Sequence, residues 1–403
     1  MAMRRTKRAG FSLVELMIAL VAGAFAVSAA YYLNGVSSRA FSEQMRVSDT
    51  QMSLRSAMEQ LRRDFSRAGF LGTPSSALVP DCDGTKSTTG NIAPRWMRAV
   101  SVTRDGSLAG EVSTMLAATT NKTRADTVDV WGNYATADAY LVDPERSTPT
   151  TIVFQETSEA FRRSFYDPVA SNGTATYNAA RFAATFIQGR MVRIENEGRY
   201  FFRDISTVSS TAGSVSVTFS TALPYCFVNT SWSAISPLMH LQYDVESDST
   251  ADLARMRSSA TAAGTGVPGA RRTMLVRREW RDDTAVVVAN TGRVVLDYAV
   301  EFAVDAMINT TAATTGRPAW AYQRSTTTAT TNPDKIGSLL VTLTARSAEA
   351  SPKLQLVPRA SFDTAGAFDS PMLMFRVVDP ASTALVLNAR VRTLRSEIFL
   401  QNQ

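Results

Sequence analysis

The strongest hydrophobic pattern of this 403-residue chain lies at its N-terminus. A predominantly apolar run extends from Phe11 to Leu33, with Glu15 as its only charge, and it follows a head with four basic residues: Arg4, Arg5, Lys7 and Arg8. At about 1.5 Å per residue, such a helix is roughly 35 Å long, enough to cross a bilayer core of about 30 Å. Because basic flanks stay in the cytoplasm, we expect everything after residue 35 to lie outside the inner membrane.

Beyond Gly35 the pattern becomes amphipathic. Apolar residues follow helical spacing at Leu54, Met58, Leu61, Phe65 and Ala68, and we predict that this stripe extends backward through Phe41, Met45 and Met52. The opposite side carries charges: Arg39, Glu43, Arg46, Asp49, Arg55, Glu59, Arg62 and Arg63. Gly69, Gly72 and Pro74 end the pattern. We therefore predict one helix from about residue 12 to 68, with Gly23 and Gly35 as candidate bend points.

After residue 75 the pattern changes to period two with β-branched runs, typical of strands. The predicted strands are Thr127–Trp131, Thr151–Gln155, Met191–Glu195, Arg199–Ile205, Val215–Ser220, His240–Val245, Thr273–Trp280, Ala285–Ala289, Val294–Val304, Leu339–Ala345 and Met372–Val378. A hairpin is expected at Glu197-Gly198, and a short helical turn near Glu159–Phe165. The expected fold class is α+β, with a long N-terminal helix packed on a large head dominated by antiparallel sheet.

Ser/Thr/Ala/Gly-rich stretches separate the strands at Pro74–Asn91, 247–270 and 309–332. They are too long and too polar for tight turns, so we expect surface loops or flexible insertions. A functional alternative is glycan attachment or adhesive contact. The sequons Asn121-Lys122-Thr123 and Asn172-Gly173-Thr174 are, however, expected by chance in a chain so rich in threonine.

The amino-acid composition excludes several further classes of function. The chain is 45% apolar and 19% charged, which supports a packed core rather than disorder. Its formal charge of +6 falls to about +2 without the four leader cations, so a broad nucleic-acid surface is not expected. With one histidine and two cysteines, a zinc cluster and nearly all histidine-based catalysis are excluded.

Cys82 and Cys226 both fall in the part of the chain expected in an oxidising compartment, so a disulfide is favoured. It would close a loop of about 144 residues and contribute roughly 4 kcal/mol in the chain-entropy model. Two buried free thiols are the alternative. The run Asp81-Cys82-Asp83-Gly84 resembles part of a calcium loop but lacks the downstream glutamate, so no metal site is predicted.

His240 is the only candidate base for a catalytic triad, and its neighbours Leu238, Met239 and Leu241 indicate a strand core. The acidic residues are scattered, and no glycine-rich phosphate loop is present. We therefore predict no enzymatic activity and no cofactor.

The N-terminal residues Gly10-Phe11-Ser12-Leu13-Val14-Glu15-Leu16-Met17-Ile18-Ala19-Leu20 resemble the class III signal of type IV prepilins and type II secretion pseudopilins. The resemblance implies cleavage between Gly10 and Phe11 by a prepilin peptidase, N-methylation of Phe11, and a role for Glu15 in recruiting the subunit into a filament. Physically, the new α-amino cation of one subunit can neutralise the Glu15 carboxylate of a neighbour in an apolar helix bundle. An ordinary secretory signal, cut near Ala26–Ala30, is the competing interpretation.

A second resemblance lies in the last third of the chain. Arg277–Trp280, Val294–Asp305, Leu339–Ser347 and Arg390–Arg395 occur in the order found in PilW-like minor pilins and in the related GspJ pseudopilins. The Ser/Thr-rich insertions depart from that pattern and leave the functions of these loops open. The size of the chain exceeds that of a usual major pilin, which favours a minor subunit.

These resemblances imply a domain plan: a leader 1–10 that is removed, a membrane or filament-core helix 11–34, its amphipathic continuation 35–72, and a β-rich head 73–403. The implied function is a PilW-like minor pilin that acts in pilus initiation or at the tip. A GspJ-like secretion pseudopilin and an anchored or secreted adhesin-type binding protein are the alternatives. The implied partners are other pilins, the prepilin peptidase, the inner-membrane assembly platform and, before assembly, membrane lipid. The implied location is the inner membrane for the precursor and the periplasm or cell surface afterwards.

Overall fold

The computed structural model describes residues 12–72, 99–116, 121–167, 175–196, 199–223, 233–247, 272–281, 286–288, 291–309, 320–323, 335–347, 374–379 and 382–400. The chain divides into two compact units, Met1–Met52 and Ser53–Gln403, and each is described by itself. Several predicted features lie outside the described residues: the leader cations, the Gly10-Phe11 cleavage site, Cys82, Cys226 and the run Asp81–Gly84.

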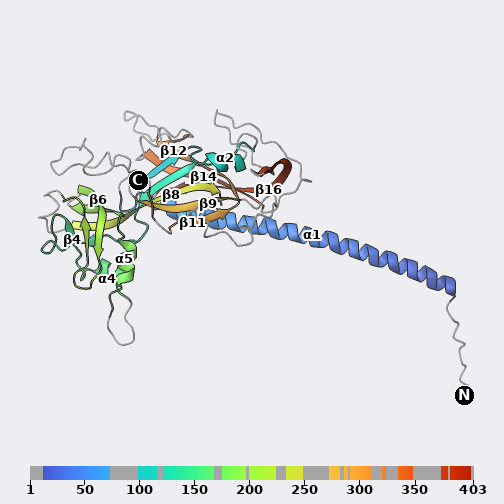
Figure 1. Ribbon diagram of the computed structural model, residues 1–403, viewed down its shortest axis with the longest axis horizontal. Coiled ribbons are helices and arrows are strands. Elements are labelled where there is room, and N and C mark those ends of the chain that lie inside the picture. Colours follow the sequence, from blue (N-terminus) through green and yellow to red (C-terminus); the bar gives the residue numbers. More distant parts are fainter. Residues whose placement is uncertain are drawn as a thin grey trace, which may run out of the picture. The chain divides into compact units, whose positions relative to one another are not determined.

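Helix α1 runs from Leu13 to Ser66 and has 54 residues (blue in Figure 1). Glu15 in the first turn and Arg63 in the last turn both complement the helix dipole. The helix is followed by Gly69, whose φ of 78° is the left-handed conformation typical of a helix C-terminal cap. The predicted helix from about 12 to 68 is therefore confirmed, and it continues through Gly23 and Gly35.

The head contains two antiparallel sheets (Figure 1). Within the described residues, the larger sheet has eleven strands. They are β1 (Val100–Thr103), β2 (Thr127–Gly132), β3 (Tyr140–Leu141), β4 (Thr151–Val153), β5 (Met191–Asn196), β6 (Arg199–Ser209), β7 (Ser216–Phe219), β8 (Ser233–Ser247), β9 (Thr273–Arg281), β10 (Val286–Val287) and β11 (Arg293–Asp297). This larger sheet supplies most of the ion pairs described below.

The long strand β8 joins two halves of this sheet. Its first part, Ser233–Leu238, pairs with β5, and its second part, His240–Ser247, pairs with β9. On its other edge β8 pairs with β3 and then with β2. Side chains from strands far apart in sequence therefore meet along β8.

The smaller sheet is formed from the last third of the chain, in the order β13-β12-β14-β16-β15. Its strands are β12 (Ala299–Asn309), β13 (Trp320–Gln323), β14 (Ile336–Arg346), β15 (Met374–Asp379) and β16 (Ser382–Phe399). Ala125, just before β2, forms a parallel bridge to Phe302 of β12, which links the two sheets.

The main core combines the end of α1 with inner residues of both sheets. Leu54, Leu61 and Phe65 of α1 are at most 2% exposed and cluster with residues of β2, β8, β12 and β14. A second core lies around β5–β7 and is rich in aromatic rings: Tyr140, Phe154, Phe161, Phe165, Phe182 and Phe186. Two short helices, α4 (Glu159–Phe165) and α5 (Ala179–Thr185), contribute three of these rings, and Phe186 is the C-cap of α5.

Most of the predicted strands are confirmed, with differences that have physical reasons. The expected strand Val294–Val304 is two strands, because Tyr298 has a φ of 55° and breaks the extended run. The stretch 309–332 is not loop throughout, since Trp320–Gln323 forms β13. Strands β1, β3 and β16 and helices α2 (Gly110–Leu116) and α5 were not predicted. The expected hairpin is supported by the pairing of Asn196 with Arg199, although its turn residues 197 and 198 lie outside the described part.

The predicted backward extension of the apolar stripe on α1 is wrong. Phe41, Met45 and Met52 are 64%, 52% and 69% exposed, whereas Leu54 is 2% exposed. At 100° per residue, these three side chains project about 140–180° away from the direction of Leu54. They form a separate surface of the helix.

Candidate functional site

The first turn of α1 is built around Ser12. The Ser12 hydroxyl accepts a hydrogen bond from the backbone N–H of Val14 at 3.3 Å, and the Ser12 carbonyl accepts one from Leu16 N–H at 3.1 Å. Glu15 stands three residues after Ser12, the spacing of a capping box. A carboxylate here is favoured by the positive end of the helix dipole. The sequence pattern Ser12-x-x-Glu15 is therefore a local signal that predicts where the helix begins.

The next turns of α1 present a continuous apolar surface. Its large hydrophobic side chains are between 49% and 82% exposed and lie within residues 13–36. Leu13, Val14, Leu16, Met17, Ile18, Leu20, Val21, Phe25, Val27, Tyr31, Tyr32, Leu33 and Val36 make up this surface. By length and composition, α1 is the one helix of the described residues that could cross a membrane.

The apolar surface and Glu15 together determine the environments that this segment of α1 can occupy. An apolar surface of this size is stable only in lipid or against other apolar helices. A carboxylate at its start needs a cation wherever water is excluded, because an unpaired charge there costs several kcal/mol. The segment is therefore suited to helix assembly around a neutralised Glu15.

The comparison with known families agrees with this geometry. A family model, described as the prokaryotic N-terminal methylation motif, matches residues 5–31. The N-terminus is that of a class III prepilin-type precursor. With the long apolar helix, this motif indicates a type IV pilin-like or pseudopilin-like precursor that is anchored in the membrane. No curated protein and no solved structure matches the chain.

In the head, Arg277 binds the end of α1. Its Nε donates to Asp64 Oδ2 at 2.8 Å, and the hydroxyl of Tyr243 donates to the same carboxylate. Burial raises the pKa of Tyr243, and the Asp64 charge adds to the effect. The contact joins α1, β8 and β9 at one point within the main core.

The neighbouring residues of β9 also form buried ion pairs. Glu279 receives two hydrogen bonds from Arg190, at 2.8 and 2.9 Å, and both side chains are 5% exposed. Arg278 pairs with Glu246 of β8. The run Arg277–Trp280 resembles minor pilins in sequence. In the structure its charged side chains tie β9 to the end of α1, to Arg190 and to β8.

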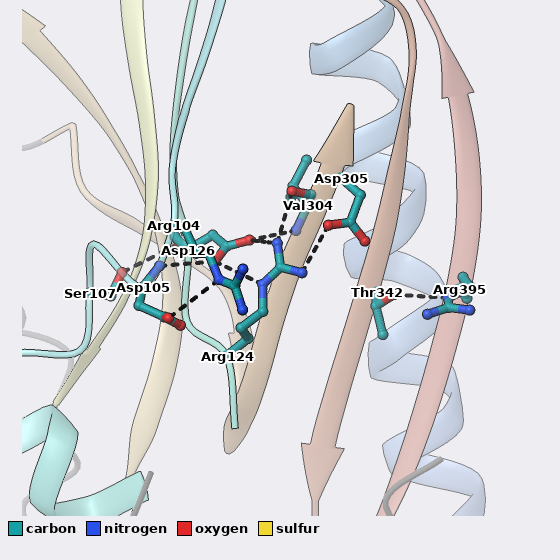
Figure 2. A network of polar contacts seen from close by, with 9 residues as sticks. All are labelled: Arg104, Asp105, Ser107, Arg124, Asp126, Val304, Asp305, Thr342 and Arg395. Carbon is teal, nitrogen blue, oxygen red and sulfur yellow. Dashed lines mark hydrogen bonds and ion pairs between the residues drawn. The ribbon is translucent and has the colours of Figure 1, made fainter. Parts of the chain in front are cut away.

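A polar network of the head surrounds Arg124 (Figure 2). Arg124 donates to both carboxylate oxygens of Asp126 and, through Nη1, to Asp305 Oδ1 at 2.8 Å. Asp126 also accepts backbone N–H bonds from Asp105 and Val304, at 3.0 and 2.8 Å. Burial lowers the pKa of Arg124, but the charges of Asp126 and Asp305 outweigh it and raise the pKa overall. The network fastens the start of β2 to β12.

His240 lies in β8, as predicted. Its Nε2 is 3.0 Å from Asp129 Oδ1, and its ring stacks on Trp131 with centroids 4.3 Å apart.

Within the described residues, no group of three or more His, Cys, Asp or Glu side chains could hold a metal. The absence of enzymatic activity stays a prediction.

Asn121 is buried rather than available to a glycan. Its side-chain amide donates to Leu116 O at 2.8 Å and Arg376 O at 2.9 Å, and it accepts from Arg376 N at 2.8 Å. The side chain thus imitates a strand partner for the edge of β15. The second sequon, Asn172-Gly173-Thr174, lies outside the described residues.

Asp244→Asn is expected to stabilise the head at neutral pH. Burial, with the Asp129 charge, raises the pKa of Asp244 to about 6, although Arg278 opposes the shift. Asp244 Oδ1 has no hydrogen-bond partner among the described residues. Because the folded pKa exceeds the unfolded value of about 3.9, the stability that Asp244 contributes is lost as pH rises from about 4 through 6.

Asp244→Asn should therefore raise the free energy of unfolding by about 1–3 kcal/mol above pH 6, and this increase should vanish below pH 4. Denaturant unfolding of the full-length protein from pH 4 to 8 measures it. Asp297→Asn is the matched control, because Asp297 is 48% exposed and pairs with Arg272 at the surface. Equal pH profiles for the two variants would contradict the burial of a destabilised charge.

Proposed function

We propose that this protein is a PilW-like minor pilin of a type IV pilus, acting in the initiation of assembly or at the tip. The observation that carries the proposal is the methylation motif at 5–31, together with the exposed apolar helix that begins inside it and has Glu15 in its first turn. The four strand motifs quoted above support the PilW-like assignment. In this proposal, prepilin peptidase cuts between Gly10 and Phe11 and Phe11 is N-methylated.

The proposed partners follow from the same segment. The residues Phe11–Leu33 pack against lipid in the precursor and against the helices of other pilins in the filament. The inner-membrane assembly platform moves the subunit from one environment to the other. The location proposed after assembly is the periplasm or the cell surface. A GspJ-like pseudopilin of a type II secretion system uses the same N-terminal chemistry and is the second candidate.

The first test is the N-terminal peptide mass of the native protein. A chain that begins with N-methylated Phe11 is expected. A chain that begins near Ala30, or one that retains the basic leader, would overturn the proposal. Deletion of the gene should abolish pili and leave type II secretion unchanged if the protein is a minor pilin, and the reverse result identifies a pseudopilin.

Glu15→Gln tests the assembly carboxylate. Membrane insertion should be unchanged, but the partner's α-amino cation would lack a counter-charge in the apolar bundle. If this unpaired cation costs about 3 kcal/mol in the free energy of assembly, incorporation into filaments should fall about 100-fold. Immunoblots of sheared filaments and of membranes measure both pools. Asp49→Asn, a carboxylate of α1 beyond the membrane segment, is the control, and an equal incorporation of the two variants would refute the role of Glu15.

A further inference from the structure

A cavity of about 320 Å³ lies in the head where strands β3 and β4 end and β8 begins. Its walls come from residues 141–145, from Gln155 and Thr157 after β4, and from Ser233 at the start of β8. The volume is at the small end of the range for ligand sites, which is about 300–1,000 Å³. The cavity therefore suits one small molecule. We call it the β3–β4 cavity.

The walls of the β3–β4 cavity are held by backbone hydrogen bonds. Val142 N–H donates to Ser233 O at 2.9 Å, and Gln155 N–H donates to Leu141 O at 2.9 Å. The segment that follows β3 is therefore paired with β8 on one side and with the end of β4 on the other. Because these walls are already ordered, little further ordering is needed when a ligand enters.

Five polar side chains line the β3–β4 cavity: Asp143, Glu145, Gln155, Thr157 and Ser233. Asp143 uses one oxygen for the fold, since its Oδ1 accepts the backbone N–H groups of Glu145 and Arg146 at 3.2 and 3.3 Å. Ser233 is 4% exposed, and its hydroxyl has no hydrogen-bond partner among the described residues. A buried hydroxyl without a partner costs free energy, and a ligand that bonds to it recovers that cost.

Other carboxylates of the same region are used by the fold itself. Glu156 accepts the backbone N–H groups of Gly213 and Val215 at 3.0 and 3.2 Å, and Asp138 pairs with Arg163. The carboxylate of Glu145 has no such contact within the part of the chain that the structure describes. The β3–β4 cavity thus has a negative charge that the fold does not neutralise.

The lining of the β3–β4 cavity determines the class of ligand. Its described residues include two carboxylates and no Arg, Lys or His, which favours a cation over an anion. Gln155, Thr157 and Ser233 add neutral donors and acceptors that match hydroxyl groups. Leu141 and Pro144 present an apolar wall for C–H groups. A metal ion is not favoured, because no group of His, Cys, Asp or Glu in the described residues could hold one.

We propose that the β3–β4 cavity binds an amino sugar with a protonated amine, either as a monosaccharide or as the end of a polysaccharide. The ammonium group pairs with Glu145 and Asp143, and the ring hydroxyls bond to Gln155, Thr157 and Ser233. This binding activity goes beyond the proposed function, because it needs neither the N-terminal helix nor a filament.

A ligand-observed NMR titration of the full-length protein tests the proposal, in a detergent without a sugar headgroup and at about pH 6.5, where such an amine is protonated. Glucosamine should bind with a Kd on the order of 1 mM. Glucose and N-acetylglucosamine should bind at least about tenfold more weakly, because neither carries the cation. Tighter binding of the β-1,4-linked glucosamine trimer supports a polysaccharide end as the ligand, and equal binding supports the monosaccharide. Equal affinity for glucosamine and glucose, or for glucosamine and ethanolamine, would overturn the proposal.

Three variants locate the binding in the β3–β4 cavity. Glu145→Gln should raise the Kd for glucosamine about tenfold, because it removes the counter-charge and keeps the size of the side chain. Glu159→Gln changes an exposed carboxylate of α4 outside the lining and should leave the Kd within about twofold. Ser233→Ala should raise the Kd about fivefold but leave the Tm unchanged or higher, since the hydroxyl has no partner in the fold.

Equal Kd values for Glu145→Gln and Glu159→Gln would refute the site, as would a lower Tm with an unchanged Kd for Ser233→Ala. These results do not depend on the proposed function, because the cavity lies in the head. A chain whose leader is never removed would refute the minor pilin and leave the titration as it is.

Discussion

Arg124→Ala is expected to destabilise the head by about 3–5 kcal/mol, the usual cost of removing one member of a buried ion pair. The variant would leave Asp126 and Asp305 as two buried carboxylates without their cation; these side chains are 0% and 8% exposed. Urea unfolding of the full-length protein in detergent, followed by near-ultraviolet circular dichroism, measures the shift.

Two further variants show whether the effect belongs to the ion pairs. Arg104→Ala is the surface control, because the Arg104–Asp105 pair is 3.7 Å long and its members are 45% and 40% exposed. It should change stability by no more than about 0.5–1 kcal/mol. The triple variant Arg124→Met, Asp126→Asn, Asp305→Asn removes all three charges and should recover most of the loss. If Arg124→Ala behaves like Arg104→Ala, the network of Figure 2 does not hold β2 to β12.

The features predicted well from the sequence are those that depend on local spacing. The ends of α1 were predicted to within two residues, since an apolar stripe and a terminal Gly69 are local patterns. The prediction failed for Phe41, Met45 and Met52 because apolar residues on one helix need not share a face. At 100° per residue these three side chains project away from Leu54, so α1 carries two separate apolar stripes.

The polar networks could not be predicted, because they join residues that only the sheet topology brings together. Arg124 and Asp305 are 181 residues apart, and Arg190 and Glu279 are 89 apart. Strand β16 was missed for a related reason. Arg392 and Arg395 interrupt its apolar alternation, and Arg395 instead donates to Thr342 of the neighbouring strand β14 at 3.0 Å.

Asp64→Ala is expected to cost about 3 kcal/mol and to loosen the end of α1. It removes the carboxylate that accepts hydrogen bonds from both Arg277 and Tyr243, and it leaves the largely buried Arg277 cation without its counter-charge. Hydrogen exchange of the amides at 61–66, together with urea unfolding, measures the local and the global effect.

A double-mutant cycle decides whether the loss belongs to the contact between helix and strand. In a chain that already carries Arg277→Met, Asp64→Ala should lower the free energy of unfolding much less than it does alone. The expected coupling energy is about 1–3 kcal/mol. Glu59→Ala, an exposed acidic residue on the same helix, should change stability by no more than about 0.5 kcal/mol. Additive effects of Asp64→Ala and Arg277→Met would mean that Arg277 does not hold the helix.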